Sequence, residues 1–124
     1  MSSTRLTAGL VMVSLALAQP AFGDGQASHG GQYIDVEGHR GIEMVAGADA
    51  LTFHLTDDHK PMDLKGAQFK VIVQSNAGTT TLPLVAEGST LKAQLKAPIA
   101  PGAKIVLTGK DGRGHTLQGR FVQK

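Results

Sequence analysis

The sequence contains no cysteine, and this absence excludes several features at once. The chain has no disulfide bonds and no thiol to carry a lipid anchor, so its hydrophobic core alone must hold the fold together. A cysteine nucleophile is excluded as well.

The chain also has few aromatic residues and almost no excess of positive charge. Aromatic residues make up 4% of the chain, Tyr33 is the only tyrosine, and 12 Lys and Arg residues face 10 Asp and Glu residues. A nucleic-acid surface needs a basic stripe and aromatic rings on which bases can stack. Neither is present, so we set nucleic-acid binding aside.

The common catalytic motifs are missing. No glycine-rich phosphate loop precedes a helical pattern, and Ser28, Ser75 and Ser89 lack the glycine pattern of a nucleophile elbow. A domain of this size without long loops seldom forms the deep cleft that a paired-carboxylate hydrolase needs. The sequence therefore favours a binding protein over an enzyme, and it indicates no organic cofactor.

Only one long hydrophobic run is present, AGLVMVSLALA at residues 8 to 18. It follows Arg5, is too short to cross a bilayer, and is followed by Pro20 and small residues. We predict a secretory signal peptide over residues 1 to 23, cut after Gly23, with a cut after Ala21 as the alternative. No second hydrophobic run follows, so we expect a soluble protein without a membrane span, and the small-residue signal favours a bacterial periplasm.

Processing at Gly23 changes the size and the charge of the chain. Of 124 residues, 101 are left, enough for a single domain. The loss of Arg5 leaves 11 basic residues against 10 acidic ones. Residues 24 to 32 (DGQASHGGQ) contain nothing to bury, and we expect them to form a flexible arm. Residues 33 to 124 should form the folded domain.

Apolar residues in this domain alternate with polar ones. This period of two residues is typical of a strand with one buried face and one solvent-exposed face. Turn residues such as Gly, Asn, Asp and Pro separate the alternating segments. The expected strands cover residues 34–36, 42–46, 51–55, 69–73, 79–86, 91–95, 104–109 and 115–122. About seven or eight short strands predict an all-β fold, a small antiparallel β-sandwich of the immunoglobulin-like type. Pro83 places its strand at a sheet edge.

The strands at 42–46 and 51–55 are joined by four residues, so we expect them to form a hairpin. Both apolar sets must face the same core, and this condition fixes the register. Met44 then lies opposite Phe53, and Ile42 opposite Leu55. On the solvent-exposed face, Glu43 lies opposite His54 and His39 lies opposite Asp58, at distances that let the paired side chains share an ion.

Four of the five histidines fall in the arm and on this hairpin. Imidazole nitrogens bind copper, zinc and nickel, and carboxylates complete such sites. Glu43 with His54 makes one group, and His39 with Asp58 and His59 makes another, too far along the hairpin to share one ion. Met62 would add a thioether and favour copper(I). The predicted metal ligands are His29, His39, Glu43, His54, Asp58 and His59.

A simpler interpretation exists for each of these features. Histidine and acid on opposed strands often form only a cross-strand polar pair. Asp57 to Pro61 (DDHKP) is also the composition of an ordinary turn, and Met62 packs into a turn as readily as it binds a metal.

The chain resembles a small periplasmic β-domain family. The resemblance rests on HGGQ (29 to 32), HRGIEMV (39 to 45), ALTFHLTDDHKPMD (50 to 63) and GAQFKVIVQS (66 to 75). Domains of this family occur alone or as the N-terminal extension of periplasmic adaptor subunits of heavy-metal efflux pumps of the resistance-nodulation-division type. His54 and His59 depart from the family pattern, so they are not carried over as family ligands.

The resemblance implies a role in handling heavy-metal cations. We therefore predict a periplasmic, non-enzymatic metal-binding protein that buffers copper, zinc or a similar cation or hands it to an efflux system. The expected partners are the cation and an envelope efflux complex. The alternative is a structural or interaction β-sandwich domain of the cell envelope with no metal site.

Overall fold

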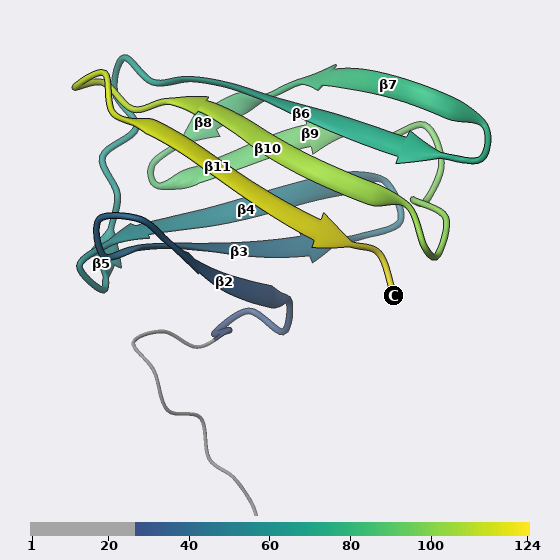
Figure 1. Ribbon diagram of the computed structural model, residues 1–124, viewed down its shortest axis with the longest axis horizontal. Coiled ribbons are helices and arrows are strands. Elements are labelled where there is room, and N and C mark those ends of the chain that lie inside the picture. Colours follow the sequence, from purple (N-terminus) through teal and green to yellow (C-terminus); the bar gives the residue numbers. More distant parts are fainter. Residues whose placement is uncertain (1–26) are drawn as a thin grey trace, which may run out of the picture.

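A computed structural model describes residues 27–124. The predicted signal peptide and the first residues of the predicted arm lie outside this range. The described chain contains ten antiparallel strands in two stacked sheets and no helix (Figure 1). None of its segments is therefore a helix long and apolar enough to cross a membrane. The predicted all-β, antiparallel β-sandwich is confirmed, and its immunoglobulin-like topology stays a prediction.

The larger sheet contains six strands and the smaller sheet four. The larger sheet has the order β2 (Gln32–Val36), β3 (Arg40–Ala46), β4 (Ala50–Asp57), β9 (Thr90–Gln94) and β8 (Val85–Glu87), with β5 (Lys60–Pro61) paired to β4. The smaller sheet has the order β11 (Thr116–Val122), β10 (Lys104–Lys110), β6 (Gln68–Ser75) and β7 (Gly78–Pro83). Every pairing is antiparallel.

The core lies between the sheets and is built by the alternation seen in the sequence. The largest fully buried side chains are Phe53, Ile42, Met44, Leu51, Leu55, Ile105, Leu107 and Val71. Complete burial of side chains of this size stabilises the fold by roughly 1.5–3 kcal/mol each. Phe53 and Phe121 join the two sheets, with ring centroids 6.0 Å apart.

The segment predicted as one strand over residues 79–86 is two strands. β7 ends at Pro83 and β8 begins at Val85, so the chain passes from one sheet to the other at Leu84. Pro83 lies on β7 and pairs with Lys70 of β6. β7 is an edge strand, as the missing N–H group of Pro83 predicted. The strand is interrupted at Leu84 because β7 pairs within the four-stranded sheet and β8 pairs within the six-stranded sheet.

The predicted hairpin register is confirmed. In the β3–β4 pair, Glu43 lies opposite His54, and Met44 lies opposite Phe53. The ladder ends where Arg40 meets Asp57, one step before the expected pair of His39 and Asp58. Those two residues are instead joined through the backbone, because the Asp58 amide donates to the His39 carbonyl at 2.8 Å.

The turn from β4 to β5 contains only Asp58 and His59. Their φ angles are 54° and 68°, the left-handed values that a tight two-residue hairpin requires at both central positions. Glycine or asparagine usually occupies such positions, because most other residues are strained in this backbone conformation. This turn therefore presents His59 at the cost of local backbone strain. Pro61 lies after the turn, within β5.

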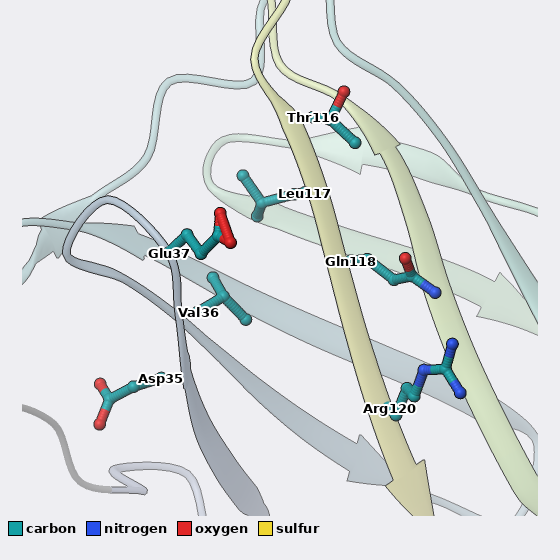
Figure 2. Close-up of a pocket in the computed structure, with 7 residues that line it drawn as sticks. All are labelled: Asp35, Val36, Glu37, Thr116, Leu117, Gln118 and Arg120. Atoms are coloured by element: carbon teal, nitrogen blue, oxygen red, sulfur yellow. The ribbon is translucent and has the colours of Figure 1, made fainter.

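Strands β2 and β11 form the open side of the sandwich (Figure 1). At one end the Gln32 side-chain amide donates to the Val122 carbonyl at 3.0 Å. Toward the other end a groove of about 570 Å³ separates the two strands. Figure 2 shows Val36 and Glu37 of one wall and Leu117 of the other pointing into this gap. None of the predicted metal ligands lines the groove.

Candidate functional site

One row of side chains crosses the outer face of the six-stranded sheet. Tyr33 lies opposite Glu43, Glu43 opposite His54, and His54 opposite Thr90. The neighbours of Glu43 in β3, Ile42 and Met44, point into the core. Since side chains alternate along a strand, the row is on the face away from the core.

Glu43 is nevertheless buried, with 3% of its surface exposed, because the N-terminal segment covers it. Its carboxylate accepts hydrogen bonds from the backbone amides of Ser28, His29 and Gly31 at 2.8–3.2 Å. The ring nitrogen Nδ1 of His29 lies 3.0 Å from Oε1 of the same carboxylate. Residues 28 to 31, expected to belong to a flexible arm, are thus fastened to the sheet by a single carboxylate.

The two glycines of this segment have different structural roles. Gly30 has a φ of +79°, a conformation that is strained for a residue with a side chain. Gly31 lies so close to the Met44 carbonyl that a Cβ atom would overlap it. Gly30 therefore lets the chain turn, and Gly31 lets it approach β3 closely enough to reach Glu43.

The hydrogen bonds determine the charge of Glu43. Burial alone would raise the pKa of this carboxyl group, but the His29 side chain and the amides of Gly31, His29 and Ser28 outweigh burial. Together they lower the pKa from 4.5 to about 2. Glu43 is therefore ionised at neutral pH and can only accept hydrogen bonds.

The docked segment places the ring of His29 on the ring of His54. The two imidazoles are stacked, with centroids 3.6 Å apart and planes within 2° of parallel. Nδ1 of His54 lies 3.4 Å from the Thr90 hydroxyl. Burial lowers the pKa of His54, nearby His29 lowers it further, and Glu43 acts in the opposite direction. His54 thus favours the neutral form, which is the form that binds metals.

The stacked rings restrict how a metal ion can bind. An ion bound by an imidazole lies near the plane of that ring, at about 2.0–2.1 Å from the nitrogen. Two parallel planes 3.6 Å apart cannot both contain one ion. The rings must therefore separate before His29 and His54 can share an ion. The side chain of His29 is 49% exposed, which leaves space for its ring to turn away from His54.

The second predicted group, His39, Asp58 and His59, lies at the β5 end of the hairpin, where all three residues are exposed. Backbone hydrogen bonding brings His39 and Asp58 together. Within residues 27–124 no three His, Asp or Glu side chains are arranged to hold a metal ion as they stand. Met62 is buried in the core with 4% exposure, which favours the packing interpretation of this residue.

Sequence reasoning missed the role of Ser28, Gly31 and Thr90 around these ligands. Hydropathy could not indicate a contact made by backbone amides, and only the Gly-Gly pair after His29 hinted at a close approach. It also missed a cluster in which Asp111 faces Arg40 at 3.7 Å and His115 at 3.3 Å. That cluster fastens the β10–β11 loop to the start of β3.

The docked segment also borders the end of the chain. A hollow of about 310 Å³ is lined by Gly30 and Gly31 on one side and by Gln123 and Lys124 on the other. The metal-ligand candidate His29 therefore lies one residue from a surface shared with the C-terminal residues.

Comparisons of the chain with protein-family models, curated proteins and solved structures found no match.

Proposed function

We propose that the protein is a periplasmic, non-enzymatic metal-binding protein in which His29 and His54 supply imidazole ligands. The observation that carries this proposal is the contact of 3.0 Å between Glu43 and Nδ1 of His29, next to the stacked ring of His54. In this arrangement Glu43 orients His29 instead of binding the ion.

The tautomer of His29 supports this assignment. An ionised carboxylate only accepts hydrogen bonds, so Nδ1 of His29 must carry the proton that lies between them. The lone pair is then on Nε2, which is the arrangement of carboxylate–histidine–metal sites. His54 has the Thr90 hydroxyl at its own Nδ1, which leaves Nε2 as its other ring nitrogen. The two Nε2 atoms are the expected ligand atoms for zinc.

The cellular role rests on the sequence. The predicted signal peptide favours delivery to the periplasm. The resemblance to domains of heavy-metal efflux adaptors favours buffering of a cation or its transfer to an efflux complex. Two imidazoles form an incomplete shell, which suits a site that passes an ion to a partner supplying the remaining ligands.

A second candidate function is a structural or interaction domain with no metal site. One observation favours it, namely that three backbone amides and the His29 ring already occupy the oxygens of Glu43. On this interpretation the cluster only fastens the N-terminal segment to the sheet.

Calorimetric titration of the processed protein with Zn(II), Cu(II) and Cu(I) separates the two functions. We expect binding of at least one ion more tightly than about 10 μM, which corresponds to roughly 7 kcal/mol. His29→Ala and His54→Ala should each weaken zinc binding at least tenfold. His115→Ala, which removes an exposed histidine outside the cluster, is the matched control and should leave it unchanged. Weaker binding of all three ions would leave the structural function as the better explanation.

A further inference from the structure

Three nitrogen atoms of the N-terminal segment converge on one oxygen atom. The amides of Ser28 and His29 lie 3.0 and 3.2 Å from Oε1 of Glu43, and Nδ1 of His29 lies 3.0 Å from it. The Ser28 hydroxyl also lies 3.2 Å from Nδ1. Two consecutive amides and the imidazole of the second residue thus surround a single point.

We propose that this point is a copper(II) site in which the ion is held by the backbone nitrogens of Ser28 and His29, by Nδ1 of His29 and by the carboxylate of Glu43. This inference rests on the proposed function, because it assumes that His29 binds a metal. It goes further by naming the ion, its oxidation state and the use of backbone atoms as ligands.

The chemistry of copper(II) fits this set of atoms. Cu(II) prefers a planar arrangement of nitrogen and oxygen ligands. An ion anchored on Nδ1 of His29 closes one small chelate ring with the amide of the same residue and a second with the amide of Ser28. Each amide gives up its proton to solvent, and the proton on Nδ1 is released or moves to Nε2. Copper stays in the +2 state throughout, so no oxidant or reductant is needed.

The docked segment is already arranged for this binding mode. The three nitrogens lie about 1 Å farther from the centre than a metal–nitrogen bond of about 2.0 Å requires. Glu43 now gathers them through hydrogen bonds, so the metal replaces the protons of those bonds and the carboxylate moves to the fourth ligand position. Arranging ligands before binding lowers the entropy cost of binding.

The two metals should therefore use different nitrogens of His29. Zn(II) has no preference for planar geometry and takes the Nε2 atoms of His29 and His54 in the proposed function. Cu(II) takes Nδ1 and the backbone. Glu43 is then a ligand for copper and only a hydrogen-bond partner of His29 for zinc.

Ser28→Pro tests the backbone ligands, because proline has no amide proton to release. Ser28→Ala is the matched control that keeps the amide and removes the hydroxyl, and Ala27→Pro controls for the stiffness of proline one residue earlier. Each processed protein is titrated with Cu(II) and with Zn(II). Circular dichroism is recorded in the visible d–d region, where a copper band arises when chiral backbone amides coordinate the ion.

We expect Ser28→Pro to lose the visible band and to bind copper at least tenfold more weakly, with zinc affinity changed less than threefold. Both controls should keep the band and stay within about threefold of the original copper affinity. A Ser28→Pro protein with unchanged copper affinity and an unchanged band overturns the inference, and so does the absence of copper binding in the original protein.

Failure of the proposed function gives a different result. If His54→Ala leaves zinc binding unchanged while Ser28→Pro removes the copper band, the pair of imidazoles is wrong and the backbone copper site stands. If both histidines prove necessary for zinc and Ser28→Pro has no effect on copper, only the backbone site is wrong.

Discussion

Glu43 and His29 are joined through both the backbone and the side chain of the histidine. The amide of His29 donates to both carboxylate oxygens at 3.2 and 2.9 Å, and its ring nitrogen faces Oε1 at 3.0 Å. One buried carboxylate thus fixes the position and the tautomer of a residue that precedes it in the chain and lies outside the strands.

Replacement of Glu43 by alanine should destabilise the protein. The variant loses the hydrogen bonds that fasten residues 28 to 31 to the sheet, and we expect the free energy of unfolding at pH 7 to fall by about 3 kcal/mol. Urea denaturation of the two proteins measures the difference. A loss below about 0.5 kcal/mol would show that the segment is not held by this carboxylate.

The same variant should lose part of the acid sensitivity of the protein. The pKa of Glu43 is lowered on folding from 4.5 to about 2. Its stabilising effect is therefore complete above pH 4.5 and disappears as the pH falls toward 2. We expect the stability difference between the original protein and Glu43→Ala to shrink over this range. A difference that is the same at pH 7 and pH 2.5 would contradict the lowered pKa.

His54 should titrate below its ordinary range, and removal of its stacking partner should reverse part of this shift. Burial and His29 both lower the pKa of His54, so His29→Ala should raise it by uncovering the ring and removing the electrostatic effect of His29. Nuclear magnetic resonance of the His54 ring protons measures both values. Because the folded-state pKa lies below the unfolded value of 6.5, His54 should also reduce stability as the pH falls below 6.5.

Gly31→Ala should be more harmful than Gly30→Ala. At position 30 a Cβ meets open space, so alanine costs only the strain of a positive φ, roughly 1–2 kcal/mol. At position 31 the Cβ overlaps the Met44 carbonyl, so the segment must leave Glu43. Hydrogen exchange of the amide at position 31 should become fast only in Gly31→Ala. Equal protection of this amide in both variants would show that the close approach to β3 is unimportant.

His59→Gly should stabilise the protein, by about 0.5–1 kcal/mol, because glycine adopts the φ of 68° without strain. His59→Ala removes the same imidazole but keeps Cβ, so it should bring no gain and serves as the control. Thermal denaturation of both variants measures the effect. If alanine stabilises as much as glycine, the imidazole and not the backbone is the source of strain.

Much of the fold could be predicted because local chemistry determines it. The alternation of Ile42, Met44, Phe53 and Leu55 fixed which face is buried, and the four-residue connection then fixed the register of Glu43 and His54. Pro83 indicated an edge because it has no amide proton to donate. The change of sheet at Leu84 has no such signal, since its residues alternate on both sides of the break.

The candidate site could be predicted only in part for a related reason. Register brought Glu43 next to His54, but the position of His29 depends on backbone amides that donate to a distant carboxylate. A polar segment with no apolar residues gives no hydropathy signal for such docking. The expected pair of His39 and Asp58 lies beyond the ladder because both residues have left-handed backbone conformations, which strand patterns do not indicate.

The side of the sandwich where β2 and β11 lie next to each other has a consequence for fusion proteins. Gly30 and Gly31 share a hollow with Gln123 and Lys124, so both ends of the fold emerge at one place. A domain attached after Lys124 would begin beside the segment that carries His29. Circular permutation with a short linker between these two segments should be tolerated. A domain tethered after Lys124 would be close enough to receive an ion released by His29.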